Sequence, residues 1–240
     1  MRSYRDAERG SALVYILIAI ALLAALTVSF MGPSGQQTQS QSTLKTVSEI
    51  SSQVEFIRSA IQECVLVHPQ GDSGARTAGA QKNAPYPLMP DDSYLDNCVA
   101  DPAAADDYVS HLRCPGKPKN DPCHADVFGA SSGKFLPPPP PLFGNWHYYA
   151  GDDGVFLWIE TDKTDSFLQT AFEKLDEDYA ECEADIVDAT SGAIDLDSGT
   201  TISCANGSRC FRVWMISKAP QAVYQAGDSD GDETAEGCGV

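Results

Sequence analysis

Three aspartates near the end of the chain have the residue type and spacing of a metal site. Asp228, Asp230 and Asp232 alternate in the sequence DSDGDE, and hard oxygen ligands alternate in this way in a calcium-binding loop. The resemblance is partial, because the glycine is Gly231 and the twelfth position is Gly239 where such a loop has glutamate. Two interpretations remain, a calcium site and a solvated acidic tail, since runs of like charge are commonly only hydrated.

A serine-hydrolase pattern occurs once, in the sequence GASSG at 129–133. A nucleophilic serine in this pattern needs a strand before it and a helix after it. Here the sequence KFLPPPPP follows, and such a proline run cannot be helical. We interpret the pattern as chance, and we predict that the chain is not an enzyme.

Histidine and cysteine side chains gather in one segment, which raises the question of zinc or haem. His111, Cys114, Cys123 and His124 have zinc-ligand side chains, but their spacing is irregular. Cys123 and His124 could end the haem-attachment pattern C-x-x-C-H, but the pattern requires a cysteine at position 120, where this chain has Asn120. We therefore interpret this segment as a disulfide-bonded loop. The sequence indicates no cofactor with certainty, and calcium is the one candidate.

The cysteines are even in number and all follow a long apolar segment, as a disulfide framework in an oxidising compartment requires. Short loops favour pairing Cys114 with Cys123 and Cys204 with Cys210, whereas the remaining connectivity stays open. The disulfide candidates are Cys64, Cys98, Cys114, Cys123, Cys182, Cys204, Cys210 and Cys238.

The net charge of −18 narrows the classes of partner. Phosphate neutralisation requires clustered Lys and Arg, and the chain has no basic stripe, so we exclude nucleic acid. Anionic lipid surfaces would repel the chain, and any membrane association must come from apolar side chains.

Such side chains are concentrated at 11–31, which contains no charged residue. At about 1.5 Å rise per residue, a helix of this length crosses the roughly 30 Å hydrocarbon core of a bilayer. The short leader 1–10 carries Arg2, Arg5 and Arg9 against two acids, which favours a cytoplasmic N-terminus. We predict a transmembrane segment with contact to lipid through residues 12–31. A cleaved signal peptide and an uncleaved anchor are the alternatives.

An amphipathic helix is predicted after a break at Gly32-Pro33, within residues 32–64. Its apolar side chains recur at three- and four-residue spacing, and charged side chains lie off this stripe. The stripe consists of Leu44, Val47, Ile50, Val54, Ile57, Ile61 and Cys64.

These features together resemble type IV pilin-like proteins. The features are a charged leader ending in Gly10, the small residue Ser11, an uninterrupted apolar helix, the break at Gly32-Pro33 and an amphipathic half. The resemblance implies cleavage after Gly10 by a prepilin peptidase, with Ser11 as the first mature residue. It also implies other pilin-like subunits and an inner-membrane assembly platform as partners.

One residue departs from the family pattern and changes which members the chain resembles. The usual glutamate, five residues after the cut, corresponds to Tyr15. Minor pilins and pseudopilins placed at or near a filament tip lack this acid, since a subunit with nothing above it has no amine to neutralise. The resemblance therefore implies a minor subunit of a type IV pilus or a type II secretion-like filament. The implied location is the inner membrane, with a periplasmic head that becomes extracellular in an assembled filament.

The remaining sequence predicts an α+β head. Residues 65–141 are rich in cysteine, proline and glycine, which indicates bridged loops and a polyproline spacer at 137–141. Within 142–240, NWHYYA and VFLWIET read as a hairpin around GDDG, with His147 packed among aromatic residues. A helix follows, capped by Thr164 or Asp165, and a second hairpin is expected to turn at Asn206-Gly207.

The predicted fold is thus a long N-terminal helix, transmembrane and then amphipathic, packed on a disulfide-bonded antiparallel β head as in pilins. An alternative from another class is a membrane-anchored periplasmic binding or enzymatic domain with an uncleaved signal anchor, which the physical chemistry of the apolar segment fits equally well.

Overall fold

The computed structural model describes residues 6–30, 34–71, 83, 85–92, 95, 106–115, 125–180, 183–199 and 202–218. The chain divides into two compact units, Met1–Ser42 and Thr43–Val240. Each unit is described by itself.

The first unit contains the apolar helix α1 (Asp6–Phe30). Residues 11–30 contain neither glycine nor proline and are rich in alanine, leucine and isoleucine, which favours a helix. Side chains are described from Leu13 to Thr27, and all of them are exposed. Within the described residues, no helix combines the length and the apolarity that crossing a membrane requires.

Helix α2 (Ser34–Val67) begins after the predicted break at Gly32-Pro33, which lies outside the described residues. Its buried stripe confirms the amphipathic prediction, because Ile50, Val54, Ile57 and Ile61 are all fully buried. Leu44 was predicted to be part of this stripe, and that prediction is wrong, since 60% of its surface is exposed.

The stripe in fact starts one residue earlier. Thr43 is buried, and its hydroxyl donates to the carbonyl oxygen of Phe167 at 3.2 Å. From Thr43 the buried positions follow at alternating steps of four and three residues, which keeps them on one helix face, whereas Leu44 lies about 100° away around the axis.

The head is built on an antiparallel sheet of four strands in the order β1-β2-β6-β3. The strands are β1 (His147–Gly151), β2 (Gly154–Thr161), β3 (Ala184–Asp188) and β6 (Arg209–Ser217). The predicted hairpin around GDDG is confirmed, with Gly151 paired to Gly154. Gly154 has a φ of +129°, and a Cβ there would meet the carbonyl oxygen of Ile216 at 2.0 Å, so this corner requires glycine.

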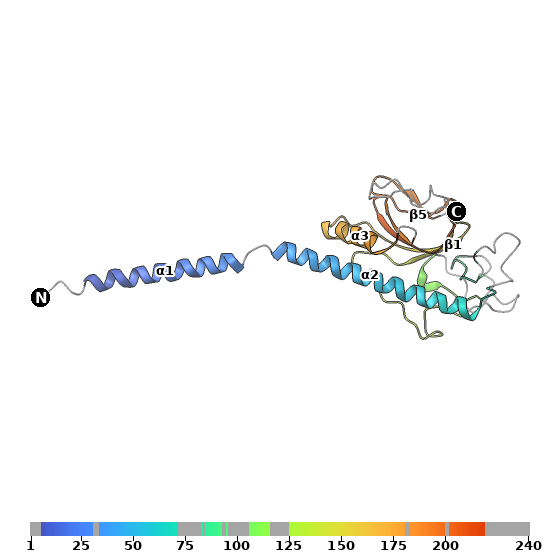
Figure 1. Cartoon of the computed structure of the whole chain (residues 1–240), viewed down its shortest axis with the longest axis horizontal. Coiled ribbons are helices and arrows are strands. Elements are labelled where there is room, and N and C mark those ends of the chain that lie inside the picture. The colour runs from blue at the N-terminus through green and yellow to red at the C-terminus, as the bar shows by residue number, and fades with distance from the viewer. Residues whose placement is uncertain are drawn as a thin grey trace. The chain divides into compact units, whose positions relative to one another are not determined.

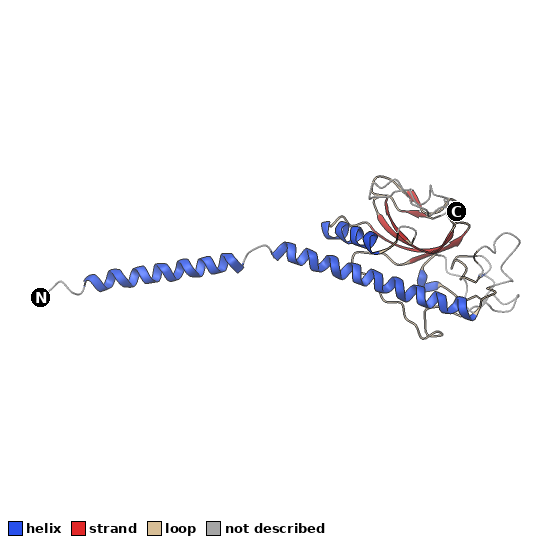
Figure 2. Cartoon of the chain, viewed as in Figure 1, coloured by secondary structure: helices blue, strands red, loops and turns tan. Residues whose placement is uncertain are grey.

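One face of the sheet is covered by two helices, as Figures 1 and 2 show. Helix α3 (Ser166–Asp178) confirms the predicted helix and buries Leu168, Ala171, Phe172 and Leu175. Asp165 occupies the N-cap position, although its side chain makes no capping hydrogen bond. The buried stripe of α2 joins the same apolar cluster as α3 and the sheet residues Val155, Leu157, Ile159, Ile186, Phe211 and Val213.

The other face of the sheet has its own apolar cluster, which includes Tyr149, Phe156, Trp158 and Trp214. The short strands β4 (Ile194–Asp195) and β5 (Ser203–Cys204) contribute Ile194 and Cys204 to this cluster and pair only with each other. The second predicted hairpin is therefore wrong in its pairing. The chain does turn at Asn206-Gly207, with Gly207 at a φ of +88°, but β5 and β6 belong to different sheets.

A fully buried arginine crosses this second cluster. Arg212 stacks over the rings of Trp214 at 4.9 Å and Phe156 at 5.6 Å, and its guanidinium donates to both carboxylate oxygens of Asp185. A further donor reaches the carbonyl oxygen of Leu196 at 2.6 Å. A buried charge without these partners would be costly, so the ion pair and the cation–π contacts belong together.

The last residues of α2 extend into the predicted loop region 65–141. The other described parts of this region are mostly irregular and include the short 3₁₀ helix η2 (Val109–His111). Gln53 of α2 ties this region to the sheet. Its side chain donates to the carbonyl oxygen of Pro138 at 2.8 Å and accepts from the indole N–H of Trp146 at 2.7 Å. Both ends of a buried amide are therefore satisfied, which fixes the proline run against α2.

The packing of α2 gives a direct stability prediction. Ile57→Ala removes a fully buried side chain and leaves a cavity, and we expect a loss of about 2–5 kcal/mol in the free energy of unfolding. Leu44→Ala is the matched control on the same helix and should change stability by less than about 0.5 kcal/mol. Chemical denaturation of the detergent-solubilised chain checks both, and equal losses would contradict the packing.

Candidate functional site

Two disulfides lie within the described residues of the head. Cys64 is bonded to Cys114, with Cα atoms 5.3 Å apart, and Cys204 is bonded to Cys210, with Cα atoms 5.9 Å apart. The predicted Cys204–Cys210 pair is confirmed. The predicted pairing of Cys114 with Cys123 is wrong.

The reason lies in the position of Cys64 at the end of the buried stripe of α2. The segment that leads to Cys114 packs against this stripe, because Val109 and Leu112 are buried in the same apolar cluster as Cys64. A contact between elements thus overrides the short loop that the sequence favoured. The other disulfide candidates, Cys98, Cys123, Cys182 and Cys238, lie outside the described residues.

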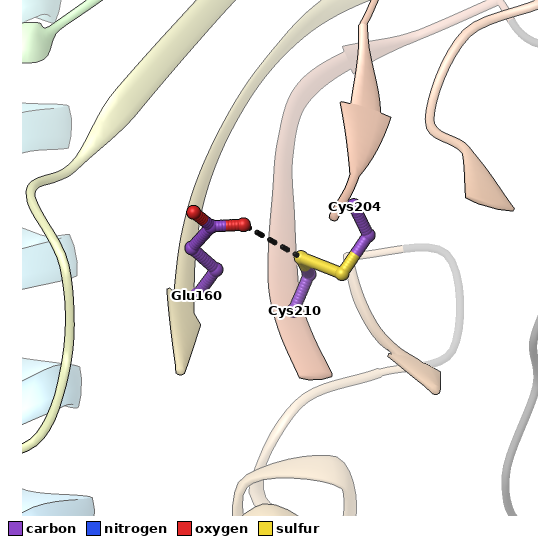
Figure 3. A group of neighbouring side chains, drawn as sticks. All are labelled: Glu160, Cys204 and Cys210. Atoms are coloured by element: carbon purple, nitrogen blue, oxygen red, sulfur yellow. Dashed lines mark hydrogen bonds between the residues drawn. A yellow bond between two sulfur atoms is a disulfide. The ribbon is translucent and has the colours of Figure 1, made fainter. Parts of the chain in front are cut away.

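A group of three potential metal ligands surrounds the second disulfide. Figure 3 shows Glu160 of β2 directed at the sulfurs of Cys204 and Cys210, and the three ligand atoms lie within 4.8 Å of one another. The carboxylate oxygen Oε2 lies 4.0 Å from the sulfur of Cys210. Because the two sulfurs are bonded to each other, neither is a thiolate, and the group lacks the charged sulfur ligands that a soft metal needs.

The segment in which zinc was considered and rejected is described only in part. Cys114 is used by a disulfide, and Cys123 and His124 lie outside the described residues. His111 has a carboxylate partner instead, since its Nδ1 lies 2.7 Å from Oδ1 of Asp106. The described residues therefore bring no zinc set together here.

A second histidine–aspartate pair lies beside the first. Nδ1 of His147 is 2.7 Å from Oδ1 of Asp107, and the ring stacks on Trp158 at 4.7 Å. The ring of Tyr108 contacts both imidazoles, at 4.9 Å from His147 and 6.2 Å from His111. The prediction of a packed His147 is confirmed, and its carboxylate partner was missed because Asp107 is forty residues away in sequence.

Carboxylates gather near these pairs and affect one another. Burial raises the pKa of Asp91, and the charges of Asp107, Asp92 and Asp106 raise it further, while a backbone hydrogen bond opposes them. Ionising Asp91 therefore costs more free energy in the folded head than in the unfolded chain.

The remaining predicted sites are tested only in part. The GASSG segment has no strand before it and no helix after it in the described residues, and the Ser131 hydroxyl donates to Asp126 at 3.1 Å. The calcium candidates Asp228, Asp230 and Asp232 lie outside the described residues. The predicted processing residues Gly10 and Ser11 lie within α1, and their side chains are also outside the described set.

A polar groove lies between α2 and β6, with a volume of about 430 Å³. Arg58 dominates it, because its guanidinium donates to the carbonyl oxygen of Trp214 at 2.9 Å and pairs with Glu183. The same group lies over the ring of Tyr179 at 5.9 Å. These contacts join α2 to β6 and to the segment between α3 and β3, so Arg58 acts as a structural residue.

The exposed side chains of α1 are the strongest candidate for a functional surface. Its large apolar residues are exposed to between 49% and 68% on every side of the helix. Exposed apolar surface on this scale indicates binding to lipid or to another protein. The residues are Leu13, Val14, Tyr15, Ile16, Leu17, Ile18, Ile20, Leu22, Leu23 and Leu26.

Comparison of the chain with known protein families, with curated proteins and with solved structures gives no match.

The disulfides predict unequal losses of stability. In the chain-entropy model, removing a bridge that closes 50 residues costs about 4 kcal/mol, and one that closes 6 residues costs about 2 kcal/mol. We therefore expect the variant Cys64→Ser/Cys114→Ser to be less stable than Cys204→Ser/Cys210→Ser. Denaturation under non-reducing conditions measures the difference, and the opposite order would contradict the described pairing or its role.

The carboxylate cluster predicts a pH-dependent effect. The raised pKa of Asp91 means that the folded state binds its proton more readily, so stability falls as pH rises from the model-peptide value of 3.8 through the folded pKa. Asp91→Asn should raise the melting temperature at pH 7, and this gain should vanish below about pH 4. Thermal melts across this range check the prediction. A gain that persists at low pH would point to a cause other than ionisation.

Proposed function

We propose that this chain is a subunit of a type IV pilus or of a type II secretion-like filament, a minor pilin or pseudopilin at or near the tip. The observation that supports the proposal is the difference in burial between two helices. Helix α1 exposes apolar side chains on all sides, whereas α2 buries one stripe against a disulfide-bonded antiparallel sheet.

This difference between an exposed apolar helix and a packed amphipathic helix is expected of a subunit that assembles through its N-terminal helix. The apolar surface of α1 would lie in the inner membrane before assembly and against neighbouring helices afterwards, since both environments exclude water. The membrane part of the proposal rests on the sequence, because residues 11–31 carry no charged side chain.

The exposed side chain at position 15 supports a place at or near the tip. Tyr15 is 68% exposed and has no carboxylate to offer a neighbouring amine. A subunit without that acid cannot neutralise the terminal amine of a subunit above it in an apolar filament core, where an unpaired charge is costly.

The disulfides support a head in an oxidising compartment. Two bridges within the described residues are expected of a periplasmic or extracellular domain and unusual in a cytosolic one. With a cytoplasmic N-terminus, a single membrane crossing would place the head in the periplasm. The proposed partners are other pilin-like subunits, a prepilin peptidase and an inner-membrane assembly platform.

Processing at the N-terminus tests this proposal. We expect the protein purified from its native membranes to begin at Ser11, with an added methyl group on the amine, as determined by intact mass and N-terminal peptide mapping. Gly10→Val should leave the leader uncut, whereas the control Gly32→Ala should be processed normally. An intact Met1 would contradict the proposal and favour the anchored binding or enzymatic domain, and a cut near Gly32 would favour a signal peptide.

A further inference from the structure

The outer edge of β3 has backbone groups that no described residue pairs with. In the order β1-β2-β6-β3, the two edge strands are β1 and β3. The edge of β1 is occupied, because the amide of Tyr148 donates to the carbonyl oxygen of Asp107, and the amide of Val109 donates to that of Trp146, both at 2.8 Å. The edge of β3 has no such neighbour among the described residues.

The hydrogen bonds at the two ends of β3 define which residues face outward. The Trp214 amide donates to Glu183 at 2.8 Å, and the Ala189 amide donates to Ser208 at 3.0 Å. Because bonded and non-bonded pairs alternate in an antiparallel ladder, the backbone groups of residues 183, 185, 187 and 189 face β6. Those of Ala184, Ile186 and Asp188 therefore face away from the sheet.

The outward amide of Ala184 is already used, since it donates to the carbonyl oxygen of Ala180 at 3.2 Å. The amide and carbonyl of Ile186 have no partner among the described residues. Asp188 likewise has no backbone partner among the described residues, so two complete pairs of strand-pairing groups, those of Ile186 and Asp188, lie along the edge.

A groove of about 430 Å³ runs beside this edge and is strongly acidic. Its charged lining consists of four carboxylates and one guanidinium, Glu173, Asp176, Glu177, Asp188 and Arg209. The three acids of α3 lie at i, i+3 and i+4 and so share one helix face. The groove is therefore a place where an extended segment with positive charges would gain attraction along with backbone hydrogen bonds.

The single guanidinium does not neutralise the groove. Arg209 is paired with Asp188, with Nε 3.1 Å from Oδ2. Although burial alone would raise the pKa of Asp188, the hydroxyl and amide of Thr190 and the charge of Arg209 lower it. Arg209 thus offsets the charge of Asp188, whereas Glu173 and Glu177 of α3 add further negative charge to the groove.

The geometry points to the edge of β3 as a docking site for an extended, lysine-bearing segment of another protein, which adds to the sheet as a fifth strand. Alternate side chains of such a strand lie on opposite faces. Lysine side chains on one face of the added strand lie near the acids of α3. The side chains on its other face extend the opposite face of the sheet. The inference concerns the head alone and does not depend on the proposed filament function.

Amide hydrogen exchange of the full-length chain in detergent micelles tests this site. The probe is the peptide acetyl-Lys-Val-Lys-Val-Lys-amide, and the control is the corresponding peptide with glutamate for lysine. In the free protein the Ile186 amide should exchange fast and the Val187 amide slowly. Saturating lysine peptide should slow Ile186 by about tenfold or more and leave Val187 unchanged, whereas the glutamate peptide should have no effect.

Charge-reversal variants distinguish binding that depends on the charges of the groove from binding that depends only on the net charge of the chain. Glu173→Lys/Glu177→Lys should reduce the slowing to less than about twofold. Asp162→Lys/Asp195→Lys changes the net charge equally at exposed positions outside the groove and should keep the effect. The inference is overturned if Ile186 is protected without peptide, if both peptides act alike, or if both variants lose binding together.

Discussion

The burial of one stripe of α2 against the sheet is the interaction on which the rest of the head depends. Each fully buried isoleucine of this stripe contributes about 1.5–3 kcal/mol relative to its exposed state. Without α2, the part of the apolar face of β2, β6 and β3 that α3 does not cover would lie in water. The same helix carries Gln53, Arg58 and Cys64, whose contacts reach the proline run, the sheet and the loop around Cys114. One packed helix thus contacts the sheet and fixes two irregular segments, the proline run and the loop around Cys114.

The helices cover only the first face of the sheet, so other parts of the chain must cover the apolar side chains of the second face. The small pair of strands β4 and β5 supplies part of this cover, and the Cys204–Cys210 bridge joins this pair to the beginning of β6. The buried ion pair of Arg212 with Asp185 adds a specific polar contact inside the aromatic cluster. Within the described part of the chain, the exposed side chains of α1 and the edge of the sheet at β3 are two surfaces that the packing of the head does not cover.

The sequence predicted those parts of the fold that rest on local periodicity. The stripe from Val47 to Cys64, the hairpin at GDDG and α3 follow from spacing and turn residues, and all three are confirmed.

The predictions that are wrong or missing concern contacts between segments that are distant in the sequence. Cys114 bonds to Cys64 because tertiary packing brings them together, although Cys123 is nearer in sequence. The turn at Asn206-Gly207 is correct, but the pairing of β5 depends on β4, which no local signal indicates. The carboxylate partners of His111 and His147 are equally invisible to spacing, and so is the open edge of β3, which depends on the strand order.

The most direct test of the account is whether the isoleucine methyl groups of α2 contact the sheet. Nuclear Overhauser effects measured on methyl-labelled full-length chain in detergent should connect the δ1 methyls of Ile50, Ile57 and Ile61 with valine and leucine methyls of β2 and β6. Their presence would establish the helix–sheet interface as the core of the head. If these isoleucines instead have the chemical shifts of solvated residues and no cross-peaks to the sheet, α2 does not pack there and the account is contradicted.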